Sequence, residues 1–238
     1  MITKVRNKLQ AVSALVSKYS ATEPAMEAVY RELFLRELNH AGLDDVYYPI
    51  GSAGNHSMLY IVARCIRQLP VQSVLELGAG ESTRLVSHLR GALCSNFEVA
   101  TVEHDNAWVQ KIQPHVSHPI LHAPLMPMAI NGYRINYYDP SVVGTGSFVD
   151  FLIIDGPPAA SAEVRFSRMG SLDIIKNRLM EDFIIVIDDV ERKGEQALVA
   201  GVRSILRRRK CDYREATIRA IKSQFIFASG KLKDASYF

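Results

Sequence analysis

Acidic side chains follow the ends of three apolar segments that are typical of buried strands. They are Glu103 after residues 97–102, Asp155 after residues 148–154, and Asp188 with Asp189 after residues 182–187. Ligands of open parallel sheets bind beyond the carboxyl ends of the strands, so this shared placement indicates a site at one edge of a sheet. Carboxylates there could accept hydrogen bonds from a ribose, take up a proton from a substrate, or ligate a hard cation.

A glycine-rich sequence joins another predicted strand to a helix. It reads Glu76-Leu77-Gly78-Ala79-Gly80-Glu81-Ser82-Thr83. Glycines at such a turn let a ligand approach the backbone closely, although a tight turn with Ser82 or Thr83 as helix N-cap would look the same. Glu103 follows after about 20 residues, the spacing of a carboxylate that binds a ribose. A dinucleotide fingerprint would place a third glycine at position 83, where the chain has threonine.

The elements that would position these residues alternate along the chain. We predict strands at 73–77, 97–102, 119–123, 148–154 and 182–187, and helices at 82–93, 107–116, 165–179 and 195–209. The strand segments are nearly continuous apolar runs, as expected when helices cover both faces. The fold class is therefore α/β, a doubly wound, mostly parallel sheet. We predict a C-terminal antiparallel pair at 213–221 and 223–229, and mainly loop at 124–147.

Three helices are expected before the first strand. They cover residues 2–16, residues 24–40 with Thr22 as N-cap and Gly42 as stop, and residues 55–68. A loop at 47–52 separates the last two. We expect one domain, 1–238, in which residues 1–55 form a helical extension of a core at 56–238.

Three segments resemble the motifs of class I S-adenosylmethionine-dependent methyltransferases, which have a Rossmann-like fold. They are Val74 to Thr83, Thr101-Val102-Glu103-His104-Asp105, and Phe151-Leu152-Ile153-Ile154-Asp155-Gly156-Pro157-Pro158, in the family's order and spacing. The resemblance implies that S-adenosylmethionine is the cofactor. The residues expected to bind it are Glu76, Gly78, Gly80, Ser82, Thr83, Glu103, His104, His122, Ala123 and Asp155. Among these, Gly78 and Gly80 would border the methionine part, Glu103 would hold the ribose, and His122 and Ala123 would lie near the adenine.

Asp155, Asp188 and Asp189 should converge at the sheet edge, where they would repel one another unless a cation or a proton lay among them. The arrangement is similar to that of metal-dependent O-methyltransferases of the catechol and macrolide-sugar types, which implies Mg²⁺ bound by these three residues. We expect Asp155 and Asp189 to remove or stabilise the acceptor proton. The alternatives are that Asp188 caps a turn, that Asp189 pairs with Arg192, and that Asp155 only orients the cofactor or a loop amide. Arg165 and Arg192, which follow the acidic strand ends, would pair with Asp155 or Asp189, or bind an anionic substrate group.

Composition narrows the function classes. The chain has 238 residues, 48% of them hydrophobic, and a net charge of +3. This charge does not suggest a nucleic-acid binder, and the basic run 207–210 is typical of the C-terminal end of a helix. Cys65, Cys94 and Cys211 are far apart and suggest neither zinc nor disulfides. No signal peptide or membrane-spanning stretch is evident, so the cytoplasm is the expected location.

We therefore predict methyl transfer to an oxygen of a small-molecule acceptor. Asp155-Gly156-Pro157-Pro158 lacks the aromatic residue of base-modifying enzymes, which argues against a nucleic-acid substrate. Two alternatives stay open: a nicotinamide-dependent oxidoreductase, and a non-enzymatic interaction module on a methyltransferase fold. The N-terminal helices could also form a homodimer contact.

Overall fold

The computed structural model describes residues 21–49 and 54–238. The helix predicted at 2–16 and its dimer contact lie outside these residues, as does part of the loop predicted at 47–52. Within the described part, no helix is both long and apolar enough to cross a membrane.

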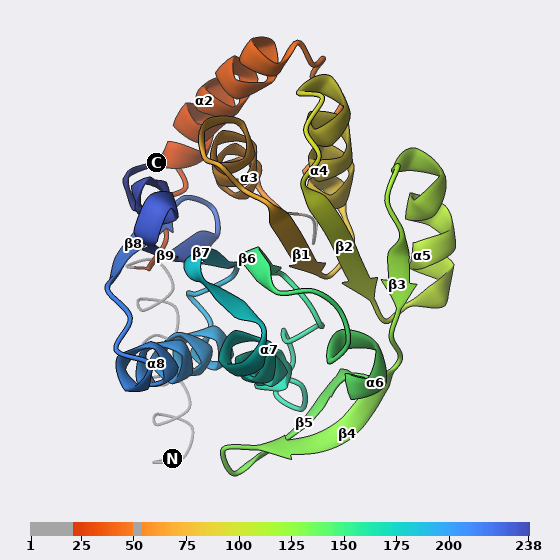
Figure 1. Cartoon of the computed structure of the whole chain (residues 1–238), viewed down its shortest axis with the longest axis vertical. Coiled ribbons are helices and arrows are strands. Elements are labelled where there is room, and N and C mark those ends of the chain that lie inside the picture. Colours follow the sequence, from red (N-terminus) through yellow and green to blue (C-terminus); the bar gives the residue numbers. More distant parts are fainter. Residues whose placement is uncertain (1–20, 50–53) are drawn as a thin grey trace, which may run out of the picture.

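A seven-stranded sheet forms the centre of the molecule (Figure 1). The strand order is β3-β2-β1-β6-β7-β9-β8. The strands are β1 (Ser73–Leu77), β2 (Glu98–Glu103), β3 (Ile120–His122), β6 (Val149–Ile154), β7 (Leu179–Ile187), β8 (Tyr213–Arg219) and β9 (Ser223–Ser229). β1, β2, β3, β6 and β7 are parallel, while β9 runs antiparallel to both β7 and β8. The predicted fold class, including the terminal antiparallel pair, is confirmed.

Helices cover both faces of this sheet (Figure 1). One layer contains α2 (Met26–Ala41), α3 (His56–Gln68) and α4 (Glu81–Ala92), and the other contains α7 (Ser171–Asn177) and α8 (Lys193–Arg208). α5 (Asn106–Ile112) packs beside β3 at the edge, and 3₁₀ helices lie at Gln113–His115, Ser167–Gly170 and Gly230–Tyr237. α2 ends at Gly42 as predicted, but its N-cap is Ala25 rather than Thr22 because a turn closed by Met26 N–H and Glu23 C=O precedes it.

The two faces of each central strand are buried in different cores. Val74, Phe151 and Ile153 pack in the cluster that contains the α2, α3 and α4 side chains. Leu75 and Leu152 point the other way, into the cluster that contains the α7 and α8 side chains. Because successive side chains of a strand alternate between faces, only a continuous apolar run can fill both cores.

The segment at 124–147 was wrongly predicted as loop. It forms a separate hairpin of β4 (Leu125–Ile130) and β5 (Tyr133–Tyr138), followed by the short α6 (Pro140–Val143). The turn is Asn131-Gly132, and both residues have positive φ, 48° and 82°. Asn-Gly is a favoured sequence for a two-residue hairpin turn of this kind. The signal was present, but the composition of the surrounding residues concealed it.

Candidate active site

The glycine-rich turn between β1 and α4 lies against the loop that follows β6. Gly78 has a φ of 97°, and a Cβ there would lie 3.0 Å from the backbone nitrogen of Gly156. A Cβ on Gly156 would lie 2.2 Å from the Tyr138 hydroxyl oxygen and 2.8 Å from Gly78 Cα. Both glycines are required because the two backbones touch here. This contact fixes the position of Asp155 relative to the turn.

Glu76 organises the turn from beneath. Its buried carboxylate accepts hydrogen bonds from the hydroxyls of Ser82 at 2.5 Å, Thr83 at 2.6 Å and Thr101 at 3.0 Å. Thr83 Oγ1 in turn accepts the backbone N–H of Gly80 at 2.8 Å. Burial raises the pKa of Glu76 to about 7, although the three hydroxyls oppose the shift. Glu76, Ser82 and Thr83 therefore hold the shape of the turn.

Glu103, at the end of β2, holds the other side of the turn. Oε2 accepts the Ala79 N–H at 3.0 Å, and Oε1 accepts the N–H groups of His104 and Asp105 at 2.8 and 2.9 Å. His104 Nδ1 lies 2.6 Å from Oε1, and its hydrogen bond to Glu103 raises the pKa of His104. Burial alone would raise the pKa of Glu103, but these donors outweigh it and lower that pKa. The carboxylate is thus kept ionised, and Oε2 has capacity for one more donor.

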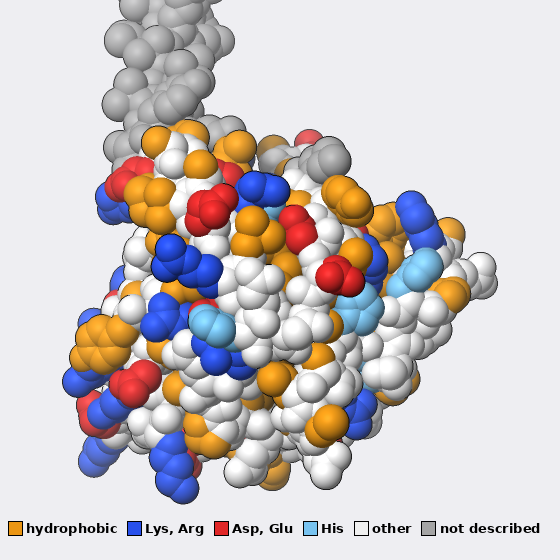
Figure 2. Space-filling model, turned by 90° about the horizontal axis from the view of Figure 1, so that it is seen from above, with side chains coloured by type: hydrophobic (Ala, Val, Ile, Leu, Met, Phe, Trp, Pro, Cys, Tyr) orange, Lys and Arg blue, Asp and Glu red, His pale blue; other side chains and the backbone are white. Residues whose placement is uncertain are grey.

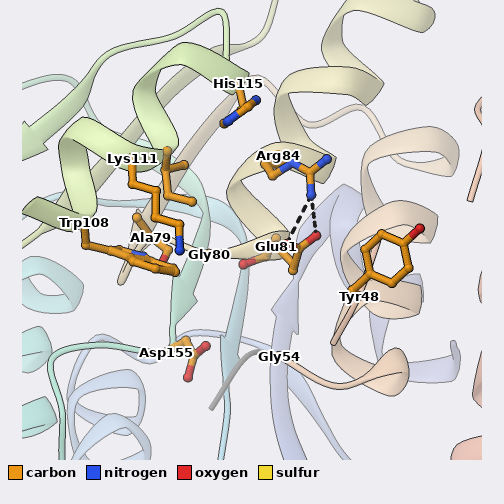
Figure 3. A pocket seen from close by; sticks show the side chains of 12 residues that line it. Tyr48, Gly54, Ala79, Gly80, Glu81, Arg84, Trp108, Lys111, His115 and Asp155 are labelled. Atoms are coloured by element: carbon orange, nitrogen blue, oxygen red, sulfur yellow. Dashed lines mark hydrogen bonds and ion pairs between the residues drawn. The ribbon is translucent and has the colours of Figure 1, made fainter. Parts of the chain in front are cut away.

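A cavity of about 470 Å³ opens beside the turn (Figure 3). Its lining includes Ala79, Gly80 and Ser82 from the turn, and Tyr48 and Gly54 from the predicted N-terminal extension. Trp108 and Lys111 lie on one side, Glu81 paired with Arg84 lies on another, and Asp155 lies at one end (Figure 3). A pocket of this size and mixed polarity is typical of small-molecule sites.

Two predicted adenine contacts lie outside this lining. His122 Nε2 is 3.0 Å from the His104 carbonyl oxygen, and Ala123 is fully buried and donates its N–H to the Glu103 carbonyl.

Trp108, in contrast, lines the cavity. It donates its indole N–H to the Ala79 carbonyl at 2.8 Å and lies over the turn. The sequence did not distinguish this position of Trp108 from ordinary packing.

The three strand-end acids do converge. Asp155, Asp188 and Asp189 each offer a carboxylate oxygen, and these oxygens all lie within 4.8 Å of one another. Asp155 lines the cavity and is partly exposed, whereas Asp188 is 0% and Asp189 2% exposed. Burial, and next the neighbouring Asp188 carboxylate, raise the pKa of Asp155 well above its usual value.

Basic side chains of the chain itself surround this cluster. Arg168, from the 3₁₀ helix before α7, is buried and places Nη2 3.2 Å from Asp155 Oδ1 and 3.1 Å from Asp189 Oδ2. Arg192 Nη1 lies 2.8 Å from Asp189 Oδ2, as one of the sequence alternatives proposed. Arg165, which was expected to pair with Asp155 or Asp189, is exposed. The ion pair with Asp155 is made instead by Arg168, three residues later.

Asp188 is held by donors from the β8–β9 hairpin. Gln224 Nε2 donates to Asp188 Oδ1 at 2.6 Å, and Lys222 Nζ lies 3.5 Å from Asp188 Oδ2 and 3.6 Å from Asp189 Oδ1. Five of the six carboxylate oxygens of the cluster thus face a donor or cation of the chain; Asp155 Oδ2 is the sixth. This donor set does not fit a resident Mg²⁺, which would need several of the same oxygens. The pairing of Asp189 with two arginines also argues against a direct catalytic role for it.

Sequence reasoning missed Arg168, Lys222, Gln224 and Glu195. Glu195, at the start of α8, is 0% exposed, and its Oε1 lies 3.6 Å from Arg168 Nε. Burial raises the pKa of Glu195 to about 7. Each of these residues belongs to an amphipathic or loop segment in which a polar residue is unremarkable, so the sequence carried no signal for them.

No protein-family model matches the chain, and no curated protein matches it. Among solved structures, it is similar to a precorrin-6y C5,15-methyltransferase from Geobacter metallireducens, with 13% identity, coverage of 79% of this chain and 96% of the other, and a TM-score of 0.48. An O-methyltransferase from Streptomyces achromogenes involved in tomaymycin synthesis has 14% identity, coverage of 92% and 96%, and a TM-score of 0.45. An O-methyltransferase from Bacillus cereus has 14% identity, coverage of 92% and 97%, and a TM-score of 0.45.

The arrangement of the sheet defines the fold. Five parallel strands are extended by an antiparallel pair in which β9 inserts between β7 and β8, and helices cover both faces. The chain therefore has a Rossmann-like α/β fold with a terminal antiparallel pair.

Proposed function

We propose that the protein transfers a methyl group from S-adenosylmethionine to an oxygen of a small-molecule acceptor. One observation carries this proposal: a cavity of about 470 Å³ extends from the glycine turn at Gly80 to the carboxylate of Asp155. The turn would hold the cofactor, and Asp155 would face the acceptor. A bound S-adenosylmethionine supplies an already activated methyl group, so the protein has only to position the acceptor and manage one proton.

The turn has room for a ligand where a side chain would otherwise lie. Gly80 lines the cavity, and a Cβ built on it meets no atom of the described residues within 4 Å. Glu103 lies behind Ala79 with one acceptor position left on Oε2, which suits a ribose hydroxyl. Trp108 bonds to the Ala79 carbonyl and lines the same cavity, so a nucleoside that reaches Glu103 must displace or stack on its indole.

Asp155 is the residue best placed to accept the acceptor proton. It lines the cavity, and Arg168 holds its Oδ1 at 3.2 Å, which leaves Oδ2 for the acceptor hydroxyl. Its pKa is raised, first by burial and then by the neighbouring Asp188 carboxylate, so it is a stronger base than an exposed aspartate. Arg168 therefore acts as a positioning residue for Asp155.

The surroundings of the cavity support a small acceptor. Tyr48 and the Glu81–Arg84 ion pair line it. Acidic and basic side chains are mixed over the face shown in Figure 2, rather than segregated into the basic stripe that nucleic acids require. We therefore propose a polar, hydroxylated small molecule as acceptor.

Calorimetric titration with S-adenosylhomocysteine tests the cofactor assignment. We expect wild-type protein to bind it, and Gly80→Ala to bind it at least about tenfold more weakly, because the added methyl group occupies the ligand's space. Gly91→Ala is the matched control, since a Cβ there also meets no atom within 4 Å and Gly91 does not line this cavity. It should bind like wild type.

The same titration with NAD separates the oxidoreductase alternative. Thr83 occupies the position of the third fingerprint glycine, is fully buried and bonds to Glu76, so we expect NAD to bind much more weakly. Tighter binding of NAD than of S-adenosylhomocysteine would overturn the proposal. Unchanged affinity of Gly80→Ala for S-adenosylhomocysteine would show that the ligand does not bind at the turn.

A further inference from the structure

The turn between β8 and β9 brings a lysine to the acidic cluster. β9 pairs with β7 up to Phe225 opposite Ile187, so the residues before Phe225 lie beside Asp188 and Asp189. Lys222 belongs to this turn, and its side chain is 16% exposed. Its ammonium is placed almost equally far from two carboxylates, 3.5 Å from Asp188 Oδ2 and 3.6 Å from Asp189 Oδ1.

Within Asp188 and Asp189, these two oxygens have no other partner among the described residues. Both are buried and accept no hydrogen bond there, whereas Asp188 Oδ1 bonds to Gln224 and Asp189 Oδ2 pairs with Arg168 and Arg192. Two buried carboxylates side by side are costly unless a positive charge lies between them. The ammonium of Lys222 supplies this charge from within the chain.

We propose that Lys222 is the resident cation of the acidic cluster and takes the place that a divalent metal would occupy between Asp188 and Asp189. The wild-type cluster therefore needs no metal and binds none. Gln224 completes the arrangement by fixing the remaining oxygen of Asp188, and it is itself held by Asn55 Oδ1 at 2.9 Å and by the Ser57 hydroxyl at 2.6 Å.

The ammonium keeps its charge in this environment. Burial alone would lower the pKa of Lys222, but the carboxylates of Asp188, Asp189 and Asp155 outweigh it and raise that pKa. Lysine is a compact point charge, which suits a position between two carboxylates better than the planar fork of arginine.

Removal of the ammonium should expose a metal site. In Lys222→Met, Asp188 and Asp189 lose this cation, and each of the three acids still offers a carboxylate oxygen within 4.8 Å of one from each of the other two. Three carboxylate oxygens at such distances can ligate Mn²⁺ or Mg²⁺ together with water. The inference goes beyond the proposed function and does not rest on it, because cation binding is measured without cofactor or acceptor.

The experiment is a Mn²⁺ titration of the full chain, in which electron paramagnetic resonance measures the concentration of free Mn²⁺. We expect no saturable binding by wild type and saturable binding by Lys222→Met, with a Kd at least about tenfold lower than any wild-type value. Lys222→Arg retains the charge and should not bind. The double variant Lys222→Met/Asp188→Asn removes a ligand and should lose the binding again.

Two binding results would overturn the proposal. One is saturable Mn²⁺ binding by wild type that Asp188→Asn abolishes. The other is a Lys222→Met variant that is folded by circular dichroism yet does not bind Mn²⁺. If Lys222→Met is unstable without metal, its Tm should rise on addition of Mn²⁺ while that of wild type does not; an unchanged Tm would equally contradict the proposal.

Discussion

Arg168 provides the most specific test of how the acidic cluster is stabilised. The residue is 4% exposed, and its guanidinium faces Asp155, Asp189 and Glu195. We expect Arg168→Met, which keeps much of the side-chain volume but removes the charge, to lower the free energy of unfolding. We also expect this loss to be larger at pH 8 than at pH 5.

The magnitude follows from the contacts that are lost. Nη2 lies 3.1 Å from Asp189 and 3.2 Å from Asp155, and removing one partner of a buried ion pair costs about 3–5 kcal/mol. The backbone carbonyls of Pro157, Asp188 and Asp155 also lose a donor, at about 1 kcal/mol each. Protonation of the carboxylates offsets part of the sum, so we expect a net loss of about 4 kcal/mol at pH 8 and about 2 kcal/mol at pH 5.

The pH dependence has a defined sign. Burial raises the pKa of Glu195 to about 7, and Arg168 is the main group that opposes this. Without Arg168 the pKa values of Glu195 and Asp155 rise further, so the folded state binds protons that the unfolded state has released. The stability of the variant is then highest at low pH and falls as the pH rises toward the folded-state pKa values.

Urea denaturation at both pH values measures the loss. Arg203→Met is the matched control, because Arg203 is paired with Glu215 at the surface, and its removal should cost about 1 kcal/mol or less at either pH. A loss for Arg168→Met that is below about 1 kcal/mol, or equal at the two pH values, would refute the reasoning.

Three further predictions concern the turn, the cavity and the hairpin. The pKa of Glu76 is raised from 4.5 to about 7, so its contribution to stability should fall by up to about 3 kcal/mol between pH 4.5 and 7. Glu76→Gln should therefore flatten the pH profile of the free energy of unfolding, measured by urea denaturation, over this interval. An unchanged profile would contradict the buried position of Glu76. Trp108 is the only tryptophan of the chain and lines the cavity, so S-adenosylhomocysteine should change the intrinsic fluorescence, and this change should be absent for a ligand that binds elsewhere. Gly132→Ala places a side chain at a φ of 82° and should lower the free energy of unfolding by about 1 kcal/mol, whereas Gly91→Ala, inside α4, should leave it unchanged or raise it; equal effects would exclude strain at the hairpin turn.

The parallel strands could be predicted from the sequence to within a few residues, since each is an apolar run buried on both faces. The largest deviation is β7, which begins at Leu179 instead of 182, so the helix before it ends at Asn177. This helix also begins later than predicted, at Ser171, because a 3₁₀ helix occupies Ser167–Gly170. The β4–β5 hairpin escaped prediction although residues 125–130 are all apolar, because Pro127 interrupts that run and proline argues against a strand. Its Asn131-Gly132 turn was the clearest local signal.

The convergence of Asp155, Asp188 and Asp189 could also be predicted, because strand order alone brings their positions together. The partners that decide their chemistry could not. Arg168 and Lys222 come from a 3₁₀ helix and a hairpin turn, and only the tertiary fold shows that their side chains point into the cluster. The direction of a side chain could not be predicted either: the hydroxyls of Ser82 and Thr83 bond to Glu76.

The most direct test of the central claim is the position of S-adenosylhomocysteine in crystals of the protein grown with it. We predict that a ribose hydroxyl lies within hydrogen-bond distance of Glu103 Oε2, that the amino-acid part runs along Gly78 to Gly80, and that the sulfur faces the Asp155 end of the cavity. Density for the ligand at another part of the surface, or a cavity without ligand at saturating concentration, would contradict the assignment of this site to methyl transfer.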